Sequence, residues 1–130
     1  PGPDIVLEHA DALLGAGDAH RVPALQVVEG GISRQGPLLT LQLKAADIEL
    51  SLGQYDAALR RFEQLAAQSP RKERWQLRRG DVLRSAGRPQ EARAAYLAAM
   101  ASIESLPPYL LQMPATRDLR RRVADRLATL

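Results

Sequence analysis

The residue types that could carry out chemistry are present in this chain, but their spacing forms no catalytic or metal-binding constellation. His9 and His20 lie on either side of a turn signal, and no third ligand stands at a spacing that zinc sites use. The serines form no nucleophile elbow, and Gly15-Ala-Gly17 lacks the strand and the Lys-Ser/Thr pair of a phosphate-binding loop. The absence of cysteine excludes thiolate zinc sites and cysteine nucleophiles. We therefore expect a non-enzymatic protein with no catalytic residue, no metal site and no cofactor.

Three aspartates recur inside similar short phrases of the sequence. The phrases are HADALLGAGD at 9–18, AADIELSLGQ at 45–54 and RGDVLRSAGR at 79–88. Asp47 and Asp81 are 34 residues apart, and the first phrase differs from this period by two extra residues within DAHRVP. Acid–base catalysis needs carboxylates in unlike environments, whereas a repeat places them in similar ones. The phrases therefore predict an internal structural repeat.

Each repeat is predicted to be a helix, a tight turn and a second helix. Gly17, Gly53 and Gly87 fall where a helix C-terminus favours a left-handed residue. Pro23 and Pro89 stand near the starts of the second helices, where a missing N–H group is tolerated. Two pairs punctuate the joins between repeats, namely Gly36-Pro37 and Ser69-Pro70.

Composition agrees with an all-α protein built as one domain over residues 1–130. Hydrophobic residues make up 45% of the chain and aromatic residues only 4%, so the core must consist mainly of alanine and leucine, which favour helices. We expect hairpins near 4–34, 38–68 and 72–104, followed by a proline-rich connector at 105–115. A capping helix at 116–129 is expected to have Thr116 as its N-cap. Its narrow apolar stripe consists of Leu119, Val123, Leu127 and Leu130.

The second and third repeats carry a recognisable set of small and aromatic residues. In the second repeat they are Ala46, Gly53, Tyr55, Ala58, Phe62 and Pro70, and in the third Gly80, Gly87, Ala92, Tyr96 and Ala99. On these residues the chain resembles the tetratricopeptide repeat family over about residues 4–104. Pro89 departs from the family's aromatic position, and Trp75 comes one residue early. The resemblance implies a right-handed α-solenoid of three repeats with a C-terminal cap.

In the tetratricopeptide repeat family, the first helix of each repeat lines a concave groove that holds peptides. The resemblance therefore implies a partner-binding groove formed by Leu7, Asp11, Leu43, Lys44, Asp47, Arg74, Leu77, Arg78, Asp81 and Arg84. Two alternatives remain open: the aspartates bond neighbouring helices, and the leucines belong to the core. The carboxylate clamp of chaperone-binding relatives is not matched, because only Arg74 and Arg78 agree with its pattern.

The charge distribution favours a protein or peptide partner and leaves two other partners open. Residues 1–33 hold five acidic residues against one arginine, whereas residues 71–130 hold thirteen basic residues against six acidic ones. RNA binding through the arginine-rich half is one alternative, but interleaved acids such as Asp118 and Asp125 disfavour a phosphate track. Self-association between the acidic and basic ends is the other.

Two minor features complete the expectations from sequence. The apolar connector residues Tyr109, Leu110, Leu111 and Met113 either pack over the third repeat or form a second site.

No apolar run approaches the length that spans a bilayer. The excess of arginine over lysine is typical of a GC-rich bacterial genome, so we expect a soluble protein of the bacterial cytoplasm or periplasm.

Overall fold

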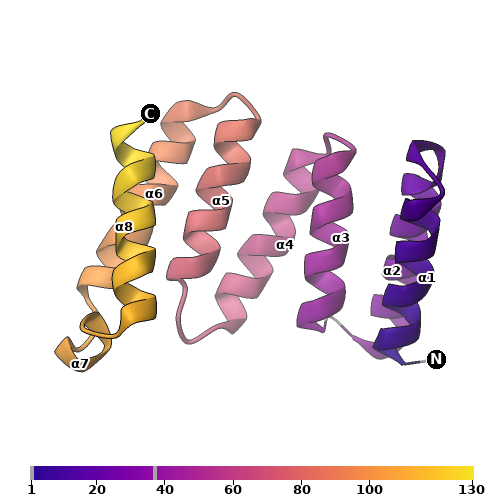
Figure 1. Ribbon diagram of the computed structural model, residues 1–130, viewed down its shortest axis with the longest axis horizontal. Coiled ribbons are helices and arrows are strands. Elements are labelled where there is room, and N and C mark those ends of the chain that lie inside the picture. Colours follow the sequence, from indigo (N-terminus) through magenta and orange to yellow (C-terminus); the bar gives the residue numbers. More distant parts are fainter. Residues whose placement is uncertain (1, 37) are drawn as a thin grey trace. The chain divides into compact units, whose positions relative to one another are not determined.

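The computed structural model describes residues 2–36 and 38–130, and in these ranges the backbone forms only helices and turns (Figure 1). This confirms the all-α class and the repeated helix–turn–helix hairpins. Pro37, part of a predicted join, lies outside the described residues. The elements are α1 Pro3–Gly15, the 3₁₀ turn η1 Asp18–His20, α2 Arg21–Gln35, α3 Leu39–Ser51, α4 Tyr55–Gln68, α5 Glu73–Ser85, α6 Pro89–Glu104, α7 Pro108–Leu111 and α8 Pro114–Ala128.

The turns between paired helices follow from glycine at each first-helix end. Gly17, Gly53 and Gly87 have φ values of 120°, 73° and 74°, which residues with a side chain rarely adopt. The two additional residues of the first turn are accommodated by η1, which directly precedes α2. The predicted helix ends and the irregular first turn are both confirmed.

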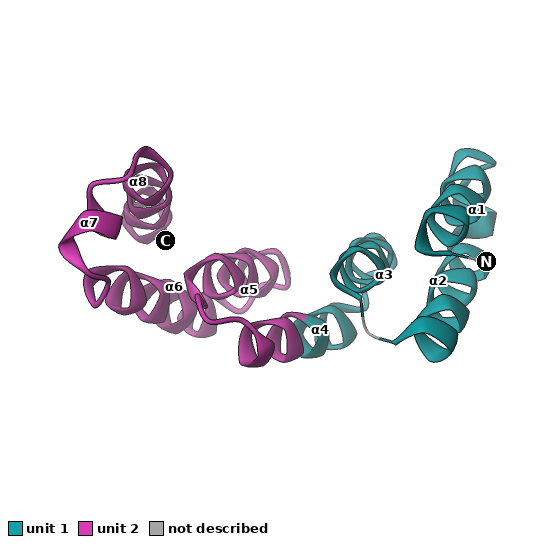
Figure 2. Ribbon diagram, turned by 90° about the horizontal axis from the view of Figure 1, so that it is seen from below, with its two compact units in different colours: residues 1–61 teal, residues 62–130 magenta. Residues whose placement is uncertain are grey.

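The chain divides into two compact units, residues 1–61 and residues 62–130, which Figure 2 distinguishes by colour. In the first unit, α1 packs against α2, and α3 packs against both. Its core combines small and branched side chains, namely Val6, Ala10, Ala24, Leu25, Val28, Leu41, Ala45 and Ile48. Alanine at the contact positions allows the helices to approach closely.

The second unit is built on the pairing of α5 with α6, and α8 packs against α6. Gly80 of α5 lies directly against the ring of Tyr96: a Cβ atom added at Gly80 would lie 2.5 Å from the nearest ring carbon. Phe62 and Trp75 are both buried. The Trp75 indole N–H also donates a hydrogen bond of 2.9 Å to the Ser69 hydroxyl.

The C-terminal segment differs from the prediction in its boundaries. The connector contains the short helix α7, and α8 begins at Pro114 with Met113 as its N-cap residue. Thr116 is therefore not the N-cap; it is buried in the first turn of α8. Proline at the first helical position explains the earlier start. The N–H group at this position forms no hydrogen bond within the helix, so proline loses nothing by lacking it.

The apolar residues of the connector are only partly covered. Leu110 and Leu111 are half-buried, whereas Tyr109 is 70% exposed and Met113 is 47% exposed. The expectation that this run packs over the third repeat is therefore wrong for Tyr109 and Met113. The stripe of α8 is confirmed at Leu119 and Val123, which are buried.

Candidate functional site

The helix α5 is buried on most of its circumference and exposes a narrow polar stripe. The side chains at this surface are those of Arg74, Arg78, Asp81 and Arg84, which we call the α5 stripe. Residues three and four apart share one face of a helix, so their side chains are neighbours. Leu77 lies between them but is only 4% exposed, so it belongs to the core and not to the surface.

Two arginines of the α5 stripe are held over aromatic rings. The Arg74 guanidinium lies 5.2 Å from the centre of the Trp75 ring, and that of Arg78 lies 5.7 Å from the centre of the Phe62 ring. Within the described residues, neither guanidinium has a hydrogen-bond or ion-pair partner. Stacking holds a planar guanidinium by its face and leaves its N–H donors at the edge for another molecule.

Asp81 is the member of the α5 stripe whose carboxylate forms hydrogen bonds to other helices of the second unit. The Tyr96 hydroxyl donates a 2.5 Å hydrogen bond to Asp81 Oδ1, and Arg126 Nε donates one of 3.0 Å to the same oxygen. These bonds tie α5 to α6 and α8 at one point. Burial and the hydrogen bond to Asp81 raise the pKa of Tyr96 to about 12, and the same carboxylate raises the pKa of Arg126.

The raised pKa of Tyr96 makes the stability of the second unit sensitive to alkaline pH. The ordinary value is 10.0, and protonated Tyr96 is favoured in the folded state. The stabilisation is complete below pH 10 and is lost as the pH rises towards 12. We expect unfolding free energies measured at about pH 9 and pH 11 to fall more steeply in the parent than in Tyr96→Phe. Parallel declines in the two proteins would contradict the assigned hydrogen bond.

In the first unit, the corresponding aspartate also links two helices. Asp11 of α1 forms an ion pair with Lys44 of α3, whereas Asp47 is exposed. Leu7 and Leu43 are half-buried, and Leu7 packs against the core. Two of the three repeated aspartates thus bond neighbouring helices, as one of the alternative interpretations of the sequence holds.

The sequence analysis missed a buried polar network that joins α3 to α4. Arg61 donates to both carboxylate oxygens of Glu49, at 2.6 and 3.1 Å, and to the side-chain oxygen of Gln42 at 2.9 Å. Its Nη2 also lies 3.4 Å from Glu29 of α2. Glu49 and Gln42 are both buried on the core face of α3. The sequence could have indicated this burial, because Gln42 and Glu49 are seven residues apart and lie on the same helix face as Ala45 and Ala46.

Residues 2–36 and 38–130 contain no group of three or more potential metal ligands. Within the same ranges, no helix combines the length and the apolar character that crossing a membrane requires. The candidate site in these ranges therefore consists of exposed guanidinium groups of α5 that lie near aromatic rings.

A sequence model of the tetratricopeptide repeat matches residues 43–107, which is half of the chain. The chain belongs to the tetratricopeptide repeat family. The match covers α5 and α6 together with most of α3 and all of α4. A comparison with curated proteins found no matching sequence.

Solved structures similar to this tetratricopeptide repeat protein include the type III secretion translocator chaperone SycD of Yersinia enterocolitica. One SycD structure matches with a TM-score of 0.71 and 17% identity, covering 98% of this chain and 88% of that one. SycD in complex with a peptide of the translocator YopD matches with a TM-score of 0.69 and 17% identity, covering 97% and 89%. At this level of identity the likeness shows a shared fold.

Proposed function

We propose that this tetratricopeptide repeat protein is a non-enzymatic scaffold that binds a peptide segment of a partner protein on the first helices of its repeats. The single observation that carries the proposal is the α5 stripe. Two arginines there are oriented by aromatic rings and have no partner within the described part of the chain. Membership of the family and the peptide complex of the structurally similar SycD support the same assignment.

The residues of the proposed site take different roles. Arg74, Arg78 and Arg84 contact carboxylates or backbone carbonyls of the bound segment, because guanidinium groups offer several donors in a fixed plane. Asp81 holds α5 in place through Tyr96 and Arg126 rather than contacting the partner.

The first helices of the other repeats supply the remaining contacts of the proposal. Leu7 and Leu43 expose part of their side chains for apolar contacts, and Asp47 is free to bond a polar group. The ion pair between Asp11 and Lys44 fixes two of these helices relative to each other. Apolar contacts provide affinity in this scheme, and the charges set the orientation of the bound segment.

The proposal is tested by affinity capture from a nuclease-treated bacterial extract. The parent is compared with a variant carrying Arg74→Glu, Arg78→Glu and Arg84→Glu, after both are shown to have equal helicity. We expect the parent to retain a protein that the variant loses. The control carries Arg34→Glu and Arg60→Glu, two exposed arginines on α2 and α4, and should behave as the parent does. Equal capture by all three proteins would refute the assigned surface. The capture is repeated from an extract without nuclease, and a protein that is retained only there would favour RNA binding.

A further inference from the structure

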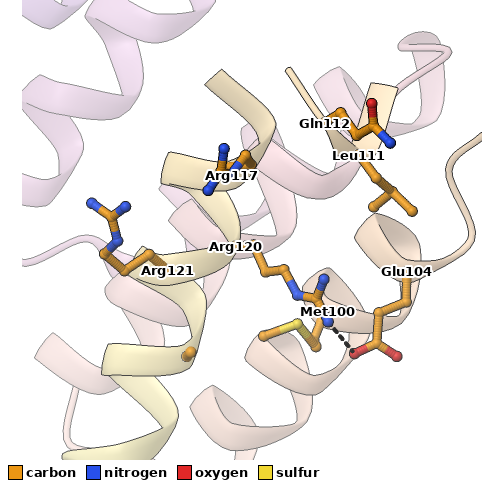
Figure 3. A pocket seen from close by; sticks show the side chains of 8 residues that line it. Met100, Glu104, Leu111, Gln112, Arg117, Arg120 and Arg121 are labelled. Carbon is orange, nitrogen blue, oxygen red and sulfur yellow. Dashed lines mark ion pairs between the residues drawn. The ribbon is translucent and has the colours of Figure 1, made fainter. Parts of the chain in front are cut away.

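A recess lies on the second unit, on residues other than those of the α5 stripe. It is a pocket of about 800 Å³ between α6, α7 and α8. Arg117, Arg120 and Arg121 of α8 line it together with Met100 and Glu104 of α6, and Figure 3 shows Arg120 reaching towards Met100 and Glu104 while Arg117 and Arg121 extend from α8 in another direction. Leu111, at the end of α7, lines the same recess.

The pocket and the α5 stripe use different faces of α8. A helix turns by 100° per residue, so Arg117 and Arg126, nine residues apart, point in opposite directions. Arg126 faces α5, where it binds Asp81. Arg117 and Arg121 are four residues apart and therefore share the pocket face. The recess is a separate surface and does not depend on the function proposed for α5.

The charges in the pocket are only partly compensated within the protein. Arg120 lies 3.9 Å from Glu104 across the recess, and the dashed line in Figure 3 marks this pair. Neither Arg117 nor Arg121 has a hydrogen-bond or ion-pair partner among residues 2–36 and 38–130. Two neighbouring guanidinium groups without a counter-ion favour a negatively charged ligand.

The remaining wall of the pocket is apolar and adaptable. Met100 and Leu111 are both half-buried, so part of each side chain is open to the recess. Methionine has three rotatable bonds and fits apolar groups of varied shape. Glu104 stands on the opposite side from the free arginines, so a continuous polyanion would be repelled there. A short segment avoids this repulsion when its carboxylate lies beside the arginines and an apolar side chain lies beside Glu104.

We propose that this pocket binds an acidic peptide segment of a partner protein. A carboxylate of the segment pairs with Arg117 and Arg121, and a neighbouring aliphatic side chain packs against Met100 and Leu111. The pocket is then a second docking point of the scaffold, with a specificity for acidic and aliphatic sequence.

The test uses the full chain carrying Arg74→Glu and Arg78→Glu, so that the α5 stripe does not contribute. The probe is a fluorescent heptapeptide of sequence ELEELLE with both ends blocked, and its binding is measured by fluorescence anisotropy at physiological salt. Adding Arg117→Glu and Arg121→Glu should weaken binding by at least about tenfold. The matched control adds Arg34→Glu and Arg60→Glu, which make the same charge change elsewhere, and should change the affinity less than about twofold.

Amide chemical shifts of the labelled protein provide a second measurement, since the peptide should perturb residues of α6, α7 and α8. The counterpart peptide KLKKLLK should not bind. The proposal is overturned if ELEELLE does not bind, if both charge reversals weaken it equally, or if the shifts map elsewhere. It is also overturned if a uridine oligonucleotide binds more tightly than the peptide through Arg117 and Arg121, because the pocket is then a phosphate site.

Discussion

Replacing Arg61 with methionine is expected to lower the free energy of unfolding by about 3–5 kcal/mol, because it leaves a buried carboxylate unpaired. Glu49 is only 3% exposed, and Arg61 supplies two hydrogen bonds to its carboxylate oxygens. The substitution also removes the donor to Gln42, a second buried polar group. Urea denaturation followed by circular dichroism measures the loss. The adjacent Arg60, which is exposed, provides a matched Arg60→Met control expected to stay within about 0.5 kcal/mol of the parent.

The double variant Arg61→Met and Glu49→Met separates a lost charge pair from lost packing. Removing both partners takes away the unpaired charge, so the double variant should recover most of the stability lost by the single one. A single-variant loss below about 1 kcal/mol would contradict the burial of this pair. Failure of the double variant to recover would show instead that the methylene groups of Arg61 contribute mainly by packing.

The second large effect is expected at Gly80, where replacement by alanine should destabilise the protein by about 1–3 kcal/mol. The added methyl group would lie 2.5 Å from the ring of Tyr96, a distance that requires the ring or the helix to move. Gly30→Ala is the matched control, since Gly30 also lies inside a helix and its nearest neighbour is the flexible end of Arg34 at 3.3 Å.

The two glycine substitutions should therefore change stability in opposite directions. Alanine is favoured over glycine in a helix interior by up to about 1 kcal/mol, and this gain applies to both sites. Gly30→Ala should raise the midpoint of urea denaturation, and Gly80→Ala should lower it. A stabilised Gly80→Ala protein would mean that α5 and α6 are not in close contact at Tyr96.

The helices and their turns could be predicted from sequence because their signals are local. Glycine at the end of each first helix and the 34-residue period place every hairpin to within a few residues. The start of α8 was predicted two residues late, because Thr116 was taken as the N-cap when Pro114 occupies the first helical position. Both residues are typical of a helix start, and the structure uses Pro114 and not Thr116.

The interactions of the charged residues could not be predicted to the same extent. Asp81 meets Arg126, 45 residues away on a helix that follows the repeats, and no repeat period relates the two. Arg61 reaches Glu49 because a long side chain crosses between helices. The three repeated aspartates are visible in the sequence, but whether each carboxylate faces a neighbouring helix or the solvent depends on packing. Leu77 shows the same limit, since its repeat position is equally compatible with the core and with a surface.

The most direct test of the proposed scaffold is the affinity of a bound peptide for variants of the α5 stripe. The segment of a captured protein that resists proteolysis while bound is synthesised and titrated by calorimetry. The account predicts that Arg74→Glu with Arg78→Glu weakens binding by at least about tenfold, while Arg34→Glu with Arg60→Glu changes it less than about twofold. Equal affinity for the parent and the α5 variant would contradict the assignment of this stripe as the binding surface.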